Sequence, residues 1–251
     1  MRRFARLTAA FALMASTVVA GAAFAGATMT DAERDAFRAE VRQYLLDNPD
    51  VIMEAMQVLQ DRQDKTAADK DQVILSDNRD IILNDPNSWA GGNPNGDITV
   101  VEFMDYRCGY CRKAYDEVAD LIKKDGNIRF VVKEFPILGE DSIASSRFAI
   151  AMRMLHGDAA YEATHSALIT LRGAPDTETL GRLAVKLGFE AQPVLDMMND
   201  DKVTAIIAAN HELAGKLNIT GTPTFVVNKA LLRGYLPEDD MARIVAEQRG
   251  S

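Results

Sequence analysis

The sequence predicts an α/β protein with a helical subdomain inserted into a strand-helix-strand framework and an α-helical arm before it. Two observations carry this prediction. Residues 97–104 and 128–135 are rich in β-branched and aromatic residues, which is typical of buried strands, and a long region between Asp141 and Leu217 instead shows helical spacing. Strand-like patterns then resume at Thr222. Helices inserted between the strands of such a framework indicate one α/β domain.

The first residues have the composition of an export signal. Arg2, Arg3 and Arg6 precede a short apolar stretch, and Ala23-Phe24-Ala25 fits a small-x-small cleavage site. The alternative is a retained membrane anchor, but the stretch is short for a span. We therefore expect a signal peptide over residues 1–25, removed near Ala25, a periplasmic mature protein and no membrane span in the mature chain.

An α-helical arm is expected over residues 26–85. No glycine occurs between Gly26 and Gly91, and Thr30 with Glu33 fits a capping box. Asn48-Pro49 separates two helical patterns. Each pattern has an apolar stripe too narrow to close a core, so the arm packs on the downstream domain or on other copies of the chain; the second alternative makes it an oligomerisation arm. The turn-rich run 85–96 marks the boundary with a domain over residues 86–251.

The only two cysteines stand as Cys108-Gly109-Tyr110-Cys111 between a strand pattern and a helix pattern. The free N–H groups and the dipole at a helix N-terminus favour a thiolate, so Cys108 is expected to attack and Cys111 to resolve the mixed disulfide. A zinc knuckle would require a second cysteine pair. The three histidines are scattered without ligand spacing, so no metal site and no cofactor are predicted.

Charge excludes two classes of partner. Removing the three signal arginines from 28 basic residues leaves 25 against 37 acidic ones, a net charge of −12. Such a surface argues against nucleic acid and anionic lipid.

These motifs resemble the thioredoxin-fold DsbA family and its ScsC and Com1-like branch. The resemblance rests on Asn-Pro-Asn-Gly-Asp from residue 93, Val-Val-Glu-Phe-x-Asp-Tyr from residue 100 and the Cys-Gly-Tyr-Cys motif, and it covers residues 86–251. The Leu45–Ile52 segment is similar to the trimerising arm of ScsC proteins. The family implies a thioredoxin fold with its helical insertion at about 141–217, a homotrimer, and a membrane redox partner that resets the active site.

The resemblance also assigns site residues. Glu102 matches a buried acid near the inner sulfur, where it would accept the proton of Cys111; the alternative is a glutamate pointing into water. Thr222-Pro223 matches the cis-proline loop that, with Gly109 and Tyr110, faces the client; a trans turn proline is the alternative.

The expected activity is thiol–disulfide exchange. Gly109-Tyr110 lacks the Pro-His of strongly oxidising members, which favours an isomerase acting on unfolded or misoxidised exported proteins. A monomeric dithiol oxidase is the first alternative. A non-catalytic chaperone or copper-buffering protein, using the two thiolates as soft ligands, is the second.

Overall fold

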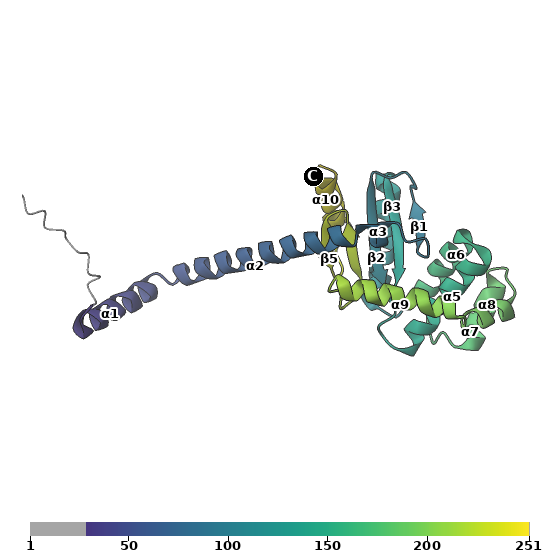
Figure 1. Cartoon of the computed structure of the whole chain (residues 1–251), viewed down its shortest axis with the longest axis horizontal. Helices are drawn as coiled ribbons and strands as arrows, with labels where there is room; N and C mark the ends of the chain where they lie inside the picture. The colour runs from purple at the N-terminus through teal and green to yellow at the C-terminus, as the bar shows by residue number, and fades with distance from the viewer. Residues whose placement is uncertain (1–28, 251) are drawn as a thin grey trace, which may run out of the picture. The chain divides into compact units, whose positions relative to one another are not determined.

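A mixed five-stranded sheet organises the part of the chain that carries the cysteines (Figure 1). The computed structural model describes residues 29–250, so the predicted signal peptide lies outside the described residues. The strands are β1 (Trp89–Gly92), β2 (Ile98–Met104), β3 (Ile128–Glu134), β4 (Thr224–Val227) and β5 (Ala230–Arg233). They lie in the order β1-β3-β2-β4-β5, with only the β2–β3 pair parallel.

Ten helices are described. Two of them, α1 (Asp31–Asp47) and α2 (Asp50–Asp77), are followed by the short α3 (Arg79–Leu83), and α4 (Gly109–Asp125) joins β2 to β3. The insertion contains α5 (Glu140–His156), α6 (Asp158–Ile169), α7 (Thr177–Lys186), α8 (Ala191–Met197) and α9 (Asp201–Lys216), and α10 (Glu238–Arg249) ends the chain. The insertion expected at about 141–217 therefore coincides with α5 to α9.

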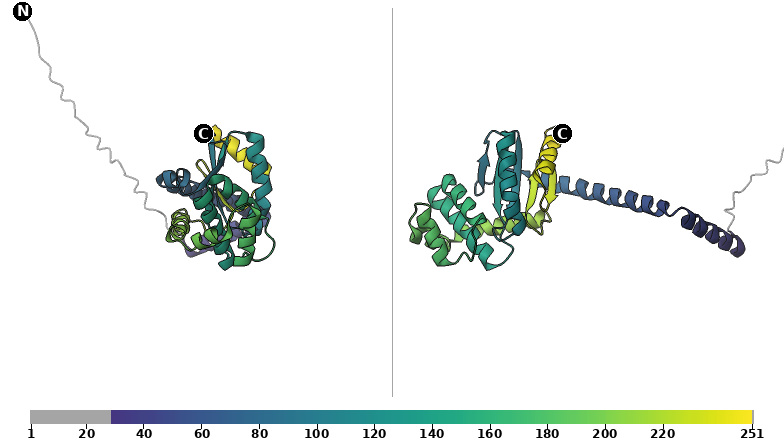
Figure 2. Two further views of the ribbon diagram at one scale, coloured as in Figure 1. Left: turned by 90° about the vertical axis from the view of Figure 1, so that its right-hand side faces the viewer. Right: turned by 180° about the vertical axis from the view of Figure 1, so that it is seen from behind.

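The sheet has a core on each face because its central strands alternate their side chains between the two sides. Even-numbered residues of β2, such as Val100 and Met104, pack with α4, α5, α6 and α10, and odd-numbered ones, such as Phe103, pack with α9 and the end of α2. Figure 2 shows α4 and α10 covering one face. This alternation places Glu102 on the same face as α4 and its cysteines.

The turn-rich run 85–96 contains a strand that the sequence did not predict. Trp89 to Gly92 pair antiparallel with β3 and form the edge of the sheet. The Trp89 ring lies where a side chain on Gly91 would stand, so a glycine is required there. Trp89 itself stacks on Tyr161 of α6, with ring centroids 5.5 Å apart.

The chain divides into two compact units between Leu59 and Gln60, whereas the sequence placed the domain boundary near Asp85. The difference has a physical cause. Leu75 and Ile82 are buried in the core formed with α9, and Asp71 makes a bidentate ion pair with Arg233 of β5 at 2.7 and 2.9 Å. The end of the predicted arm thus belongs to the unit that contains the sheet.

The first unit exposes apolar side chains. The predicted capping box of Thr30 and Glu33 is present, and α1 has no buried residue. A groove between α1 and the start of α2 is lined by two arginines and five apolar residues: Arg38, Arg42, Phe37, Val41, Leu45, Leu46 and Ile52. The apolar stripes of α1 and of the first part of α2 are therefore largely exposed in the single chain.

Candidate functional site

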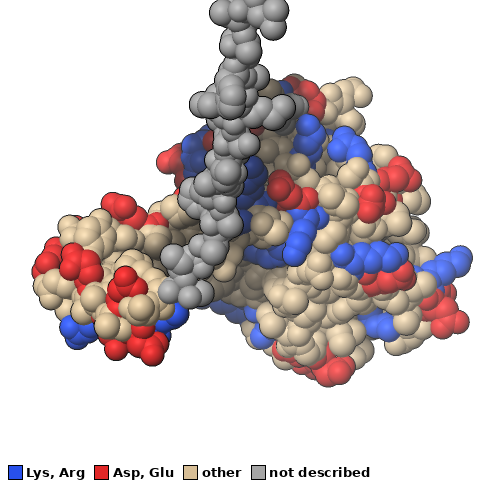
Figure 3. Space-filling view, turned by 60° about the vertical axis from the view of Figure 1, so that its left-hand side comes forward, with Lys and Arg blue, Asp and Glu red and all other residues tan. Residues whose placement is uncertain are grey.

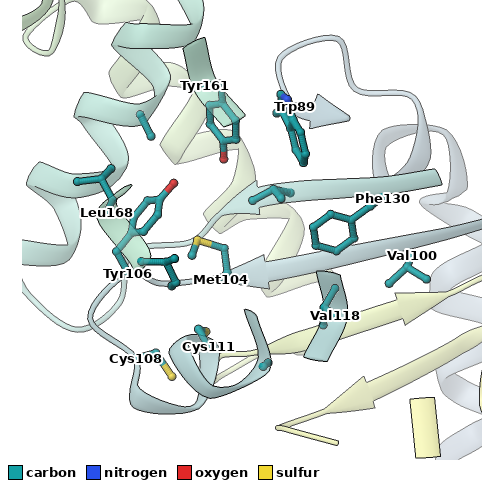
Figure 4. Packing of buried hydrophobic residues seen from close by; sticks show 14 of the residues in the cluster. Trp89, Val100, Met104, Tyr106, Cys108, Cys111, Val118, Phe130, Tyr161 and Leu168 are labelled. Carbon is teal, nitrogen blue, oxygen red and sulfur yellow. The ribbon is translucent and has the colours of Figure 1, made fainter. Parts of the chain in front are cut away.

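The redox motif begins where β2 runs into α4 (Figure 4). Cys108 is the N-cap of α4 with extended backbone, and Cys111 lies in the first turn. Asp105 fixes the connecting loop: its carboxylate accepts hydrogen bonds from the main-chain N–H groups of Arg107, Ile137 and Leu138 and from the Ser142 hydroxyl, at 2.7 to 3.1 Å. The loop therefore holds both cysteines in place.

The two thiols have opposite electrostatic environments. The Cys111 thiol donates a hydrogen bond to the Cys108 sulfur, and this is the main cause that lowers the pKa of Cys108 to about 5. Hydrogen bonds from Thr222 and from the N–H groups of Cys111 and Tyr110 act in the same direction, whereas burial acts against them. The same interaction with Cys108, together with burial and the charge of Glu102, raises the pKa of Cys111. Both cysteines are unpaired and buried. At neutral pH Cys108 is a thiolate and Cys111 a thiol.

Glu102 is buried beneath this pair, with 6% of its surface exposed. Burial, followed by the charges of Cys108 and Glu134, raises the pKa of Glu102 to about 8. A carboxyl with that pKa exchanges protons near neutral pH. The side chain thus points inward, as the resemblance implied, and not into water.

The Thr222–Pro223 peptide bond is cis and faces Cys108. The Cys108 sulfur lies 3.1 Å from the main-chain oxygen of Thr222, to which it donates when it is protonated. The loop is held from behind, because the Gly234 N–H donates to the Pro223 oxygen at 2.9 Å and the Thr224 hydroxyl donates to the Gly221 oxygen at 2.8 Å.

The dipeptide between the cysteines lies at the surface. Gly109 has open space around its α-carbon, and Tyr110 is 62% exposed. The Tyr110 ring stacks on Tyr235, and the ammonium of Lys113 lies 4.0 Å from the centroid of the Tyr235 ring. An exposed aromatic ring therefore lies next to Cys108 in the sequence.

Sequence reasoning missed a polar cluster behind the motif. The carboxylate of Glu134, at the end of β3, accepts hydrogen bonds from the hydroxyls of Tyr106, Tyr161 and Ser146. His165, whose pKa burial lowers to about 4, contacts the Tyr106 hydroxyl at 3.0 Å. Only the position of Tyr106, two residues before Cys108, offered a sequence signal for this cluster.

Neither a metal cluster nor a membrane-spanning helix is found within residues 29–250. No group of three histidine, cysteine or acidic side chains there is placed to hold a metal ion. No helix in this range is both long and apolar enough to cross a bilayer.

Comparison with known proteins identifies the family. The sequence profile of the DSBA-like thioredoxin domain matches residues 99–246, and that of the copper resistance protein ScsC N-terminal domain matches residues 33–65. The chain belongs to the DsbA-like thioredoxin family. Its fold is therefore thioredoxin-like, with an inserted helical region and an N-terminal helical region.

Solved structures that resemble this DsbA-like chain include the following three. A thioredoxin-like oxidoreductase from Silicibacter pomeroyi is 42% identical, covers 69% of this chain and 99% of its own, and has a TM-score of 0.65. A periplasmic thioredoxin-like protein from Salmonella enterica serovar Typhimurium is 25% identical, with coverages of 69% and 96% and a TM-score of 0.62. ScsC from Proteus mirabilis in a transitional conformation is 25% identical, with coverages of 89% and 98% and a TM-score of 0.64.

The chain spans about a fifth of the length of the first curated relatives it matches. These are two sodium/proton antiporters from Salinispora arenicola and Salinispora tropica, 28% and 27% identical over 131 residues.

Proposed function

We propose that this DsbA-like protein is a periplasmic protein disulfide isomerase that works as a homotrimer. The observation that carries the proposal is the pairing of an acidic Cys108 thiol with a Cys111 thiol kept protonated. A thiolate attacks at neutral pH, and a protonated neighbour delays resolution, so the client has time to rearrange.

In the proposed reaction, the Cys108 thiolate attacks a wrong disulfide of the client, forms a mixed disulfide and releases a client thiolate. That thiolate, or another, attacks a different sulfur of the client, and a client thiolate finally displaces Cys108. No net electrons are transferred. If Cys111 attacks instead, the client leaves reduced and the Cys108–Cys111 disulfide requires an external reductant, the role proposed for a membrane redox partner.

Site roles follow from these positions. Glu102 accepts the proton of Cys111 during resolution, Thr222 and Pro223 offer main-chain groups to an extended client, and Gly109 and Tyr110 form the exposed surface beside the sulfur. Clients are unfolded or misoxidised exported proteins. On the face shown in Figure 3, basic and acidic side chains are interspersed, which gives no continuous basic surface there for nucleic acid.

One observation favours a second function, a dithiol oxidase. A Cys108 pKa lowered to about 5 stabilises the reduced protein, and this makes its disulfide more oxidising. The two functions differ in net electron transfer: the isomerase transfers none, whereas the oxidase takes two electrons from its client.

Three assays separate the alternatives. Reactivation of a scrambled multi-disulfide protein in a glutathione buffer supports the isomerase, and stoichiometric oxidation of a dithiol peptide without such reactivation supports the oxidase. Tight Cu(I) binding in a competition titration, with neither activity, supports copper buffering. Cys108→Ser is the control, since it removes the attacking sulfur and is expected to abolish both exchange activities.

A further inference from the structure

A second buried carboxyl shares the sheet face of Glu102. In the parallel register of β2 and β3, Glu102 lies opposite Val132 and Met104 opposite Glu134, so both acids point to the side that carries α4. Glu134 is 3% exposed. Among the described residues, neither acid has an ion pair to a lysine or arginine. Two buried carboxyls without counterions do not both ionise easily.

Hydrogen bonds define the environment of Glu134. The Tyr106 and Tyr161 hydroxyls donate to its Oε1 at 2.8 and 2.5 Å, and the Ser146 hydroxyl donates to its Oε2 at 2.7 Å. Because the Tyr106 proton is directed at Glu134, the 3.0 Å contact with His165 requires a proton on His165 Nδ1, donated to the Tyr106 oxygen. The rings of Tyr106 and Tyr161 approach from the redox loop and from α6 (Figure 4).

A cavity of about 260 Å³ connects this network to Glu102, since both Glu102 and His165 line it. Its walls include the apolar rings of Trp89 and Phe130, the charged residues Lys123 and Glu162, and the hydroxyls of Tyr115 and Ser166, which are 2.6 Å apart. The space is large enough for several water molecules, at roughly 30 Å³ each. Glu134, Tyr106 and His165 therefore form a hydrogen-bonded series, and the last of them lines the same cavity as Glu102.

We propose that Glu134 is a second proton-holding group of the redox site, a positioning residue that acts on Cys111 through Glu102. The inference rests on the roles proposed above for Cys111 and Glu102. In the resolving step the S–H bond of Cys111 breaks and its proton goes to Glu102. The Cys108–Cys111 bond forms, the Cys108–client bond breaks, and the client leaves as a thiolate. The charge on Glu134 then determines how readily Glu102 takes that proton.

The sign of this coupling follows from the charges. A negative Glu134 favours the protonated form of Glu102. Burial raises the pKa of Glu134 to about 7, although the hydrogen bonds from its three hydroxyl donors act to lower it. Charged and polar groups from every surrounding element face Glu134. They are Glu102 on β2, Asp105 and Tyr106 in the redox loop, Ser146 on α5, Tyr161 and His165 on α6, and Asn210 on α9. Arg153 on α5 lies beyond Tyr161. The charge of Asp105 also favours protonation of Glu134.

The test is a carboxyl titration by carbon-13 NMR in the reduced full-length protein. Glu134→Gln keeps an oxygen for the two tyrosines and removes the charge, so the pKa of Glu102 should fall by about half a unit or more. Tyr161→Phe removes one hydrogen-bond donor and makes Glu134 less acidic, so it should also lower the pKa of Glu102, but by a smaller amount. Glu178→Gln, on the surface of α7, is the matched control and should leave it unchanged.

The same variants are then compared in the pH profile of mixed-disulfide resolution, followed by stopped flow. The midpoint should move to lower pH in Glu134→Gln. An unchanged Glu102 pKa in folded Glu134→Gln overturns the inference; if that variant does not fold, an unchanged pKa in Tyr161→Phe does so. If Glu102→Gln leaves the resolution profile unchanged while the NMR coupling is present, the proposed role of Glu102 is the part that fails.

Discussion

At the scale of single residues, the sulfur atoms of Cys108 and Cys111 differ because one accepts the hydrogen bond that the other donates. Main-chain N–H groups at the start of α4 add to the stabilisation of negative charge on Cys108. Cys111 is surrounded by the body of the domain and by Glu102, which disfavour its ionisation. One helical turn thus separates a nucleophile from a proton-bearing thiol.

This difference predicts selective alkylation. In the reduced protein, Cys108 should react with iodoacetamide with a half-maximal rate near pH 5, while Cys111 stays unmodified up to neutral pH. Mass spectrometry of peptides after a short pulse measures both. Cys111→Ser should keep the Cys108 profile and accumulate mixed disulfides. Faster labelling of Cys111 than of Cys108 at pH 7 contradicts the assignment.

A second residue-scale prediction concerns Glu102 and stability. Its pKa rises from an ordinary 4.5 to about 8 on folding, so between these values the folded state binds more protons than the unfolded state. Stability therefore falls as pH rises through this window. Glu102→Gln removes this slope and should be more stable than the parent at pH 8 by more than about 1 kcal/mol. Urea unfolding at pH 5 and pH 8 measures it; equal slopes in parent and variant refute the assignment.

Sequence reasoning reached the residues whose signals are local. The cysteine pair precedes a helix pattern, and Glu102 stands within an apolar strand, so their placement was predictable. The Glu134 cluster was not, because its three hydroxyl donors come from positions 106, 146 and 161 and meet only after α5 and α6 fold against the sheet.

At the scale of elements, the N-terminus of α4 is where the redox potential is set. Gly109 occupies the first helical position with open space, a position that accepts proline. Since the potential depends on how strongly the Cys108 thiolate is stabilised, the exposed position 110 can alter it without disturbing the core.

We expect the parent potential to lie between about −270 and about −120 mV, the values of thioredoxin and a strong oxidant. Gly109→Pro with Tyr110→His should shift it upward, because a histidine beside Cys108 stabilises the thiolate. Equilibration with glutathione buffers measures the shift. Tyr110→Phe is the control and should leave the potential nearly unchanged. An unaltered equilibrium constant in the double variant refutes the argument.

Strand β1 shows where element prediction failed. A short segment containing two glycines has no strand pattern of its own, and it becomes a strand because β3 offers a free edge. The segment that leads into β1 is held by Lys133, which is fully buried on the opposite face of β3. The Lys133 ammonium donates to the Ile81 oxygen at 3.1 Å and to the Asp85 carboxylate at 2.7 Å. A lysine in a strand pattern gives no sign of such a role.

Lys133→Met should destabilise the protein by about 3–5 kcal/mol, because it leaves the carboxylate of Asp85 partly buried without its counterion. Adding Asp85→Asn should recover a large part of this loss. Urea unfolding of the parent and the three variants forms the double-mutant cycle. Additive losses would show that the pair is not coupled.

At the scale of the whole molecule, the question is what the first unit contributes. Phe37, Tyr44 and Met56 are each more than half exposed in the single chain. Apolar surface of this kind favours association between copies. An isomerase gains from several Cys108 thiolates around one client, whereas an oxidase requires a single encounter.

The division between Leu59 and Gln60 shows where to separate the two activities. A truncation reaching residue 72 removes Asp71 and with it the ion pair to Arg233, whereas deleting residues 27–59 retains this pair and the buried Leu75. We expect the 27–59 deletion to leave a folded monomer that has lost most isomerase activity and oxidises dithiol peptides faster than the parent, because its disulfide is more freely approached. Analytical ultracentrifugation, reactivation of a scrambled protein and peptide oxidation measure the three properties.

A matched variant separates loss of association from loss of chain. Phe37→Ser with Met56→Ser keeps the full length and changes only exposed apolar side chains, so it should dissociate and reproduce the activities of the deletion. A parent that sediments as a monomer, or a deletion that isomerises as well as the parent, removes the basis for the arm and favours the monomeric oxidase. A dissociated Ser variant with full isomerase activity would instead show that one active site suffices.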